Sequence, residues 1–259
     1  MQMSIWDEKS LKGRRIALVL SGGGAKGAYQ IGMMRALEEA GLEKEQLTMA
    51  GTSIGALNAL MYAIKDIDAM RVMIYQMNDM TGRVEAFAKE QYPDALLSAN
   101  RIPVTVCAYC VERERPEYFR LWELTPEEQR AVTIASASLD DLLPPVAFRG
   151  CRYLDGGKIP MVCSPQAAAA DKIPLQALAE KLTASAFDLL LISYLKPEDS
   201  LDLTGIQVPV LESRPSEPLE DEPGTGTRDY SPERLEKNER MGYEETRHLL
   251  QNTRLPEMN

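Results

Sequence analysis

One short turn organises this sequence: Met49-Ala50-Gly51-Thr52-Ser53-Ile54-Gly55-Ala56. It reads as the end of a strand, a tight turn with the pattern G-x-S-x-G, and the start of an apolar helix. The glycines two positions before and two after Ser53 matter because side chains there would collide with the neighbouring strand and helix. The pattern therefore predicts a strand-turn-helix unit with the Ser53 hydroxyl exposed at its tip.

The residues on both sides of this turn favour the same interpretation. Residues 47–50 form a short apolar segment that leads into the turn, and residues 54–64 predict a helix that is apolar nearly all round. Such a helix belongs in the interior of a domain. An alternative interpretation is that Ser53 only caps a buried helix, since serine is a favoured N-cap residue. The pattern alone does not distinguish a nucleophile from a helix cap. The distinction depends on whether the chain also supplies a base and an oxyanion hole for Ser53.

Composition limits the classes of protein to which the chain can belong. Its 259 residues, 44% of them hydrophobic, predict a single domain of above-average size spanning residues 1–259. The formal charge of -10 disfavours nucleic acid and anionic membrane surfaces as tightly held partners, because both would be repelled. Neutral or zwitterionic substrates, and peripheral contact with a membrane that carries them, remain compatible with this charge.

The chain shows no sign of export or of a spanning segment. Four cysteines are too few for a disulfide scaffold, and nothing near residue 1 resembles a signal peptide. No apolar run approaches the roughly 18 residues that a transmembrane helix needs. We therefore expect a cytoplasmic protein with free thiols.

A glycine-rich turn precedes the Ser53 region. Residues 16–20 form an unbroken apolar run, typical of a strand covered on both faces. Ser21-Gly22-Gly23-Gly24-Ala25-Lys26-Gly27 follows directly, and residues 28–40 then read as a helix that Gly41 ends. A strand, a glycine-rich turn and a helix make the first half of a βαβ unit.

Three interpretations of the glycine-rich turn have to be compared. Gly22, Gly24 and Gly27 fit the dinucleotide pattern G-x-G-x-x-G, but no acidic residue ends the second strand, where one would hold the ribose. The P-loop pattern fails because Lys26 is followed by Gly27 rather than by Ser or Thr. The turn could simply change the direction of the chain. Alternatively, the amide groups of residues 22–25 at a helix N-terminus form a nest for a developing oxyanion.

The rest of the chain reads as alternating helices and strands. We predict helices at 66–80, at 125–138, at 174–182 and at 231–251, and a helix followed by a loop closed by Pro93 within 81–99. Strands are predicted at 102–111, with a partner at 118–122, and at 187–195, and a hairpin at 148–154. Residues 212–229, rich in proline, glycine and acidic residues, predict a solvated surface loop.

A serine nucleophile needs a group that takes its proton. The only histidine, His248, falls in the polar C-terminal helix, where a solvated side chain is the better interpretation. The base must then be a carboxylate or a lysine. Asp155 is the candidate because it follows a predicted strand and precedes Gly156 and Gly157, which permit a close approach to Ser53, although such a sequence is usually only a turn.

No metal or redox site is predicted. Cys107 and Cys110 form a C-x-x-C pattern, but residues three apart in a strand face opposite sides. The chain has no second pair with this spacing and a single histidine.

Taken in order, Ser21 to Gly27, Gly51-Thr52-Ser53-Ile54-Gly55 and Asp155-Gly156-Gly157 resemble the three signature blocks of the patatin-like phospholipases. The resemblance extends to Ala135-Ser136-Ala137-Ser138, Pro144-Pro145-Val146, Tyr230-Ser231-Pro232-Glu233-Arg234 and Gly242-Tyr243-Glu244, and so covers nearly the whole chain. It implies a three-layer α/β/α sandwich with a mostly parallel central sheet. It also implies cofactor-free, metal-independent hydrolysis of acyl esters in lipids or lysolipids, as by a phospholipase A, a lysophospholipase or an esterase.

The resemblance assigns roles residue by residue. It places the nucleophile at Ser53, the base at Asp155 and the oxyanion hole at Gly22, Gly23 and Gly24, and the nest formed by the glycine-rich turn adds the Ala25 amide. The residues Lys26, Gly27, Gly51, Gly55, Gly156 and Gly157 support these motifs. The Ser-Asp dyad agrees with the argument from the single histidine.

One stretch departs from the family pattern. Members typically follow the D-G-G turn closely with an Asn-x-Pro segment, whereas here residues 158–170 intervene. They could be an insertion that lines or covers the acyl site, or a distortion that displaces Asp155. We expect the first, because the three blocks are intact within a core of about 14–200. The alternatives for function are a non-catalytic acyl-lipid-binding or regulatory module and a nucleotide-binding enzyme.

Overall fold

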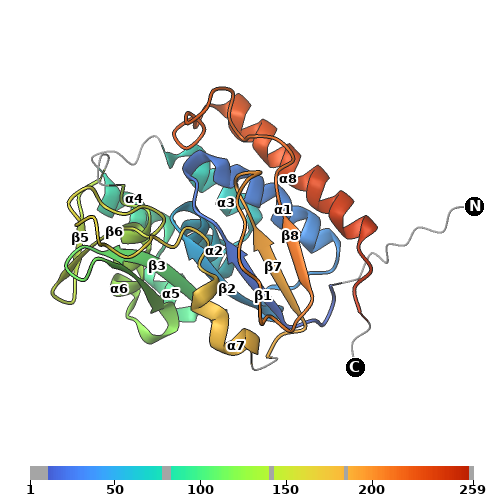
Figure 1. Cartoon of the computed structure of the whole chain (residues 1–259), viewed down its shortest axis with the longest axis horizontal. Helices are drawn as coiled ribbons and strands as arrows, with labels where there is room; N and C mark the ends of the chain where they lie inside the picture. The colour runs from blue at the N-terminus through green and yellow to red at the C-terminus, as the bar shows by residue number, and fades with distance from the viewer. Residues whose placement is uncertain (1–10, 78–82, 140–142, 184–185, 257–259) are drawn as a thin grey trace, which may run out of the picture.

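A computed structural model describes residues 11–77, 83–139, 143–183 and 186–256 (Figure 1). One sheet contains the strands β1 (Ile16–Leu20), β2 (Leu47–Thr52), β3 (Val104–Cys110), β4 (Arg115–Arg120), β5 (Val146–Phe148), β6 (Cys151–Asp155), β7 (Leu189–Ser193) and β8 (Val210–Ser213). Their order is β5-β6-β3-β2-β1-β7-β8, and β4 pairs with β3. The α-helices are α1 (Ala28–Glu39), α2 (Ile54–Ile64), α3 (Ile67–Tyr75), α4 (Val84–Gln91), α5 (Asp94–Ala99), α6 (Pro126–Ser136), α7 (Ala179–Thr183) and α8 (Pro232–Asn252).

The sheet is parallel in its centre and antiparallel at one end. Strands β3, β2, β1, β7 and β8 run parallel to one another, with Ile16 of β1 opposite Leu47 on one side and Leu189 on the other. Strands β4, β5 and β6 pair antiparallel. The apolar runs of β1 and β7 are buried throughout, as expected for central parallel strands. The predicted α/β class with a mostly parallel central sheet is confirmed.

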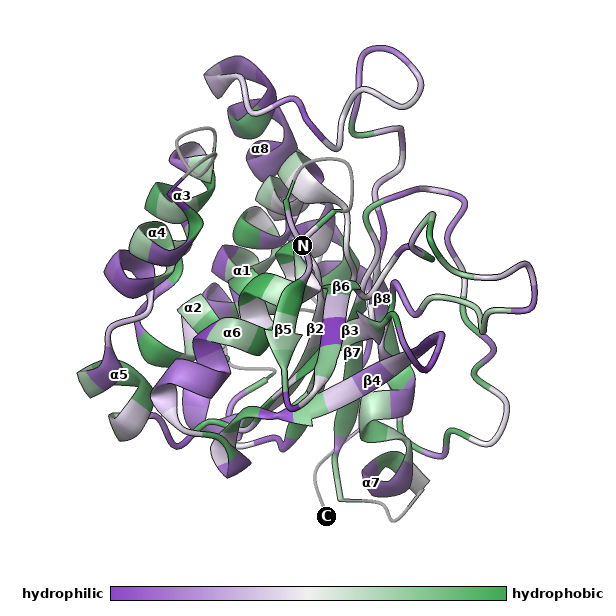
Figure 2. Cartoon of the chain, turned by 90° about the vertical axis from the view of Figure 1, so that its left-hand side faces the viewer, coloured by the Kyte–Doolittle hydropathy of each residue, from purple (hydrophilic) through white to green (hydrophobic). Residues whose placement is uncertain are grey.

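Alternate residues of β1 enter two hydrophobic clusters, one on each face of the sheet. Leu18 packs with apolar residues of α1, α2, α3, α6 and α8, whereas Ala17 and Val19 pack with α7 and the 3₁₀ turn Leu175–Leu178. Figure 2 shows this asymmetry, with most helices on one side of the sheet and α7 on the other. The third layer of the sandwich is therefore thin.

The C-terminal helix α8 packs closely on α1. A Cβ atom at Gly32 would lie 1.8 Å from the carbonyl oxygen of Glu239, and one at Gly242 would lie 2.0 Å from that of Tyr29. Two backbones can come this near only where side chains are absent. The predicted polar helix thus has one face against the core, where Leu235 and Leu250 are buried.

Several predicted boundaries differ from the structure. The partner of β3 begins at Arg115 rather than at 118, because the turn is shorter than expected, and residues 121–123 form a 3₁₀ turn. The helix predicted at 66–80 is α3, whose N-cap is Asp66, and its predicted end at 78–80 lies outside the described residues. Within 81–99, Pro93 separates two helices, α4 and α5. The helix predicted at 174–182 is a 3₁₀ turn followed by the short α7.

The predicted surface loop at 212–229 is only partly correct. Its first residues belong to β8, which pairs with β7, and Leu219 and Gly226 are buried, whereas residues 221–225 are exposed. Composition predicted solvation correctly for the middle of this segment and missed its packed ends. Nowhere in the described ranges does a helix combine the length and the apolar character needed to cross a bilayer.

Candidate active site

Ser53 occupies a strained turn between β2 and α2. Its φ of 56° and ψ of -128° are rare for a residue with a side chain. It stands at the N-cap position of α2, yet its side chain forms no capping hydrogen bond. The interpretation of Ser53 as a simple helix cap therefore lacks the hydrogen bond that defines a cap.

The two glycines of the G-x-S-x-G pattern lie where the sheet and α2 come closest. A Cβ atom at Gly51 would lie 2.4 Å from the Gly55 carbonyl oxygen, and one at Gly55 would lie 2.2 Å from the Leu20 carbonyl oxygen. Real Cβ contacts essentially never come this close. The spacing inferred from the sequence thus has a steric cause, and it holds α2 against the end of β1.

Strand pairing brings Asp155 to the same point. Strand β4 occupies one edge of β3, so β2 and β6 share the other edge and approach each other from opposite ends. Thr52, the last residue of β2, lies opposite Cys107, and Asp155, the last residue of β6, lies opposite Ala108. Cys107 and Ala108 are neighbours on β3, so Ser53, which follows Thr52, is brought next to Asp155.

The end of α6 fixes both strand ends, a role that the sequence did not reveal. The Ser136 hydroxyl accepts a hydrogen bond from the Ser53 NH (2.8 Å) and donates one to the Cys107 carbonyl (2.5 Å). The Asp155 NH donates to the Ser138 carbonyl (2.9 Å). The Ala135-Ser136-Ala137-Ser138 run was visible in the sequence, but only the fold shows that it contacts both candidate residues.

The glycine-rich turn lies directly against Ser53. A Cβ atom at Gly22 would lie 3.0 Å from that of Ser53. The Gly22 NH donates to the Lys172 carbonyl (2.9 Å), and the NH of Ala25, a buried residue, donates to the Thr227 carbonyl (3.0 Å). For the NH groups of Gly23 and Gly24 we find no acceptor among the residues that the structure describes.

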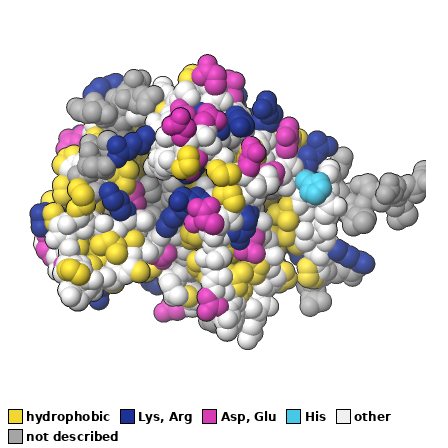
Figure 3. Space-filling model, turned by 45° about the horizontal axis from the view of Figure 1, so that its top comes forward, with side chains coloured by type: hydrophobic (Ala, Val, Ile, Leu, Met, Phe, Trp, Pro, Cys, Tyr) yellow, Lys and Arg dark blue, Asp and Glu magenta, His cyan; other side chains and the backbone are white. Residues whose placement is uncertain are grey.

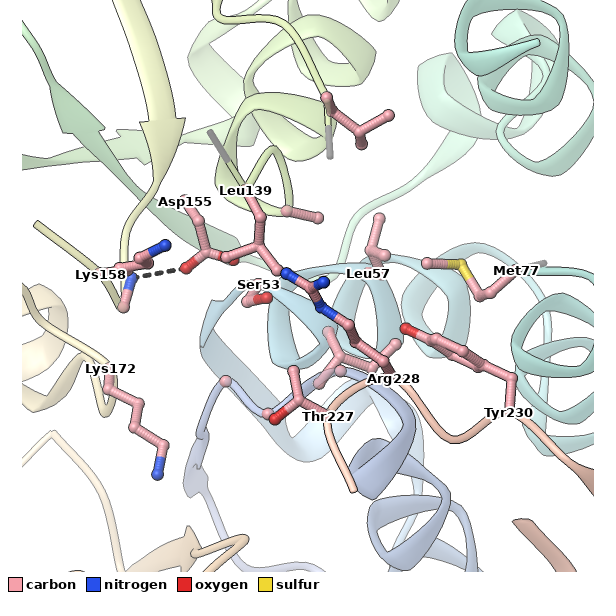
Figure 4. A pocket seen from close by; sticks show the side chains of 17 residues that line it. Ser53, Leu57, Met77, Leu139, Asp155, Lys158, Lys172, Thr227, Arg228 and Tyr230 are labelled. Atoms are coloured by element: carbon pink, nitrogen blue, oxygen red, sulfur yellow. Dashed lines mark hydrogen bonds between the residues drawn. The ribbon is translucent and has the colours of Figure 1, made fainter. Parts of the chain in front are cut away.

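A cavity of about 340 Å³ joins these groups. It is lined by Gly22, Gly23, Gly24, Ser53, Ile54, Leu57, Met77, Ala137, Leu139, Leu143, Asp155, Gly157, Lys158, Lys172, Thr227, Arg228 and Tyr230. In the view of Figure 4, Leu57 and Met77 lie on one side of Ser53 and Asp155, Lys158 and Lys172 lie on the other, and the Arg228 side chain reaches toward Ser53 between them. The site is therefore amphipathic, with Ser53 at the boundary.

The electrostatics of the cavity depend on its partly buried ionisable groups. Burial, and then the nearby charge of Asp155, raises the pKa of Tyr230 to about 12. The Asp155 carboxylate also accepts a hydrogen bond from the Gly157 NH (2.8 Å), drawn as a dashed line in Figure 4. A carboxylate held by a backbone NH within a turn keeps a defined orientation.

Lys26, considered above as a phosphate ligand, is engaged elsewhere. Its ammonium group pairs with Glu220 (2.7 Å), and both side chains are largely buried. The Glu220 carboxylate also accepts from the Gly226 NH (3.1 Å), while Thr227 contacts Gly24. We call residues 219–230 the strap, because this segment crosses the glycine-rich turn and supplies Thr227, Arg228 and Tyr230 to the cavity wall.

Residues 158–170 form a closed excursion whose ends lie together. The Asp171 NH donates to the Gly156 carbonyl (2.8 Å), and the Thr52 hydroxyl donates to the Asp171 carbonyl (2.8 Å). Between these ends only Lys158 lines the cavity. The excursion therefore does not interrupt the pairing of β6 that positions Asp155.

Other candidate groups lie away from this cavity. His248 is exposed on α8 beside Glu244 and Glu245, and its ring is the cyan patch in Figure 3. Cys110, Glu112 and Cys151 bring potential metal ligands together, but Arg152 already binds the Glu112 carboxylate (2.7 Å).

Comparisons with known proteins agree on one family. The family model described as "Patatin-like phospholipase" matches residues 18–102, which include the glycine-rich turn and Ser53. The chain is 31% identical over 190 residues to "Lysophospholipase nte1" of Aspergillus terreus, covering 61% of this chain and 11% of that protein. It is 32% identical over 167 residues to "Patatin-like phospholipase domain-containing protein 7" of Rattus norvegicus, covering 58% of this chain and 12% of that protein.

The chain therefore matches only about a tenth of the length of these relatives. Among solved structures, that of VipD from Legionella pneumophila aligns with a TM-score of 0.50 at 14% identity, covering 93% of this chain and 67% of that one. At this identity the similarity concerns the fold.

Proposed function

We propose that the chain, which is similar to patatin-like phospholipases, is a lipid acyl hydrolase that cleaves acyl esters through a Ser53-Asp155 dyad. Its activity would be that of a phospholipase A, a lysophospholipase or a related esterase. The observation that carries this proposal is the meeting of the strained Ser53 turn and the last residue of β6 on one edge of β3, within one cavity.

In the proposed reaction, the Asp155 carboxylate takes the proton of the Ser53 hydroxyl while the Ser53 oxygen attacks the acyl carbonyl carbon. The alcohol of the lipid leaves with a proton returned by Asp155, and the acyl group stays on Ser53. Asp155 then takes a proton from water as the water oxygen attacks the acyl-enzyme, and it returns this proton to the departing Ser53 oxygen, which releases the fatty acid and restores the Ser53 hydroxyl and the Asp155 carboxylate. The strained backbone keeps the Ser53 hydroxyl at the tip of the turn.

Charge that develops on the carbonyl oxygen needs donors aimed into the cavity. We assign this role to the NH groups of Gly23 and Gly24. Gly22 and Ala25 were included in the sequence-based expectation, but their NH groups donate to Lys172 and Thr227 in this structure. Gly22 keeps a steric role, because its lack of a side chain allows the turn to approach Ser53.

The two sides of the cavity suggest how a substrate lies. An acyl chain fits the apolar side with Leu57 and Met77, and the polar part of an amphiphile fits the side with Lys158. Within the lining, the basic residues Lys158, Lys172 and Arg228 outnumber the acidic Asp155, although the Lys172 ammonium also pairs with Asp199 (2.6 Å) outside the lining. This supports lipids with a polar head over purely apolar esters.

The experiment measures acyl hydrolysis together with covalent labelling by a fluorophosphonate. We expect the wild type to be labelled and to hydrolyse a lysophospholipid and an aryl ester in the presence of a chelator. Ser53→Ala should abolish labelling, and Asp155→Asn should lower kcat by about 10³, since loss of a base commonly costs 10²–10⁴. His248→Ala and Asp202→Asn, which change exposed side chains away from the cavity, should leave kcat unchanged.

Binding without turnover is the alternative outcome. If folded wild-type protein bound fatty acid but neither reacted with the fluorophosphonate nor hydrolysed esters, the chain would be an acyl-lipid-binding module. Unchanged hydrolysis in Ser53→Ala would exclude the dyad.

A further inference from the structure

Strands β3 and β6 extend beyond the cavity, past the point where β2 ends at Thr52. Strand β3 continues for three residues past Cys107, the residue opposite Thr52, and β6 returns antiparallel to it. At about 3.3 Å per residue, the turn after Cys110 therefore stands about 10 Å beyond the level of Ser53. We use the name projection for this turn, residues 111–114, together with residues 158–163 beside it.

Specific contacts hold the excursion against the turn. The Ser164 NH and hydroxyl both donate to the Glu114 carboxylate (2.7 and 2.5 Å), and the Ala168 NH donates to the Glu114 carbonyl (2.9 Å). The Tyr109 hydroxyl donates to the Ala168 carbonyl (2.7 Å). The Cys163 thiol contacts the Val111 carbonyl (3.9 Å). The two parts of the projection therefore form one unit.

The projection exposes large apolar side chains to solvent. Met161 is 73% exposed, Val162 70% and Ile159 40%. These three account for half of the large exposed hydrophobic side chains in the described part of the chain, and they fall within four residues. Exposed apolar side chains that stand singly need no explanation, but a cluster of them marks a surface for interaction. Lys158, immediately before them, lines the cavity.

The charge of the projection favours a zwitterionic lipid surface over an anionic one. The projection carries two cationic side chains, Arg113 and Lys158, and two anionic ones, Glu112 and Glu114, in a chain of net charge -10. The remainder of the protein is repelled by an anionic membrane, whereas the projection is close to neutral. A zwitterionic lipid aggregate fits this combination.

We propose that the projection docks on the surface of zwitterionic lipid aggregates, with Met161 and Val162 inserted among the acyl chains and the cavity held at the interface. This inference rests on the proposed function, since it explains how an aggregated substrate reaches Ser53. In this proposal residues 159–163 contact the lipid aggregate, while Lys158 and other segments line the cavity.

Binding is tested by co-sedimentation with phosphatidylcholine vesicles, using Ser53→Ala protein so that no lipid is consumed. Met161→Ser combined with Val162→Ser should lower the partition coefficient by at least about 10-fold, because two apolar side chains lose their transfer from water. The matched control is Val72→Ser, which changes a 53% exposed valine on α3 and should leave partitioning unchanged. Met161→Trp should strengthen binding and show a blue shift of fluorescence when vesicles are added.

Hydrolysis separates docking from chemistry. The Met161→Ser, Val162→Ser enzyme should cleave a monomeric, water-soluble short-chain ester as fast as the wild type, and should lose about 10-fold in apparent affinity for aggregated lysolipid. A failure of the proposed function would instead remove hydrolysis of the monomeric ester from the wild type, whatever its vesicle binding.

Two results would overturn the docking proposal. One is equal partitioning of the wild type and the double variant. The other is a wild-type dimer that dissociates in the double variant, seen by analytical ultracentrifugation, because the apolar side chains would then be covered by a second copy of the chain.

Discussion

The Lys26 ammonium and the Glu220 carboxylate form an ion pair of 2.7 Å, with side chains only 4% and 14% exposed. The pair joins the glycine-rich turn to the strap. Removing one member of a buried pair leaves an uncompensated charge, which costs about 3–5 kcal/mol. We expect Lys26→Met and Glu220→Gln each to lower the free energy of unfolding by about 3 kcal/mol in urea denaturation, and the double variant to lose less than the sum.

The same pair should affect catalysis through the turn. If it positions the Gly23 and Gly24 amides, Lys26→Met should lower kcat by at least about 10-fold with little change in KM, since these donors act mainly in the transition state. Arg83→Met is the control, because Arg83 and Glu90 form an exposed ion pair that is worth less than about 1 kcal/mol. A Lys26→Met enzyme that folds and keeps its kcat would show that the ion pair only stabilises the fold.

A pH dependence of stability follows from Glu220. Burial by itself raises the pKa of this carboxyl group, but hydrogen bonds from Lys26 and from the NH groups of Gly224 and Gly226 outweigh it and lower the pKa to about 2. A carboxyl group whose pKa falls on folding stabilises the protein above its unfolded pKa, and this contribution is lost as pH falls toward the folded value. The wild type should therefore lose stability between about pH 4.5 and pH 2.

The measurement compares unfolding free energies of the wild type and Glu220→Gln across this range. The difference between them should be largest above pH 5 and should shrink on acidification, because protonation makes the wild-type side chain neutral as well. A difference that stays constant down to pH 2.5 would mean that Glu220 is not the group that titrates.

Ser136 links the nucleophile turn to β3, so its hydroxyl should matter for both activity and stability. Ser136→Ala leaves the Ser53 NH and the Cys107 carbonyl without their partner, and each unsatisfied buried group costs about 1–3 kcal/mol. We expect kcat to fall by about 10-fold or more, measured with the aryl ester. Thr133→Val is the control on the same helix, since within the described residues the buried Thr133 hydroxyl has no hydrogen-bond partner. That substitution should be neutral or stabilising, with unchanged kcat.

Local patterns predicted the elements that hold the cavity. The apolar runs at 16–20 and 187–195 indicated central strands, and the glycines around Ser53 indicated the turn, because these features depend on neighbours in sequence. The pairing of β2 and β6 on one edge of β3 could not be predicted, since it joins residues about 100 positions apart. The hydrogen bonds of the Gly22 and Ala25 amides, and the Lys26-Glu220 pair, depend on such distant contacts as well.

Gly22 tests the steric argument at the nucleophile. A Cβ atom there would lie 3.0 Å from the Ser53 Cβ and 3.3 Å from the Thr52 carbonyl oxygen, so Gly22→Ala must displace the Ser53 turn by a few tenths of an ångström. A misplacement of about 1 Å costs about 10²-fold in rate, and we therefore expect a folded enzyme with kcat lowered by about 10-fold.

Gly205→Ala provides the matched control for this substitution. Gly205 has a φ of 84°, and beyond its chain neighbours no described residue has an atom within 4 Å of the position that a Cβ would take. Alanine there meets only the backbone cost of the left-handed conformation, about 1–2 kcal/mol. Its kcat should equal that of the wild type, while urea denaturation reports the lower stability. If both alanine variants lost stability equally and neither lost activity, the approach of the glycine-rich turn to Ser53 would be looser than the distances indicate, and the steric role of Gly22 would fail.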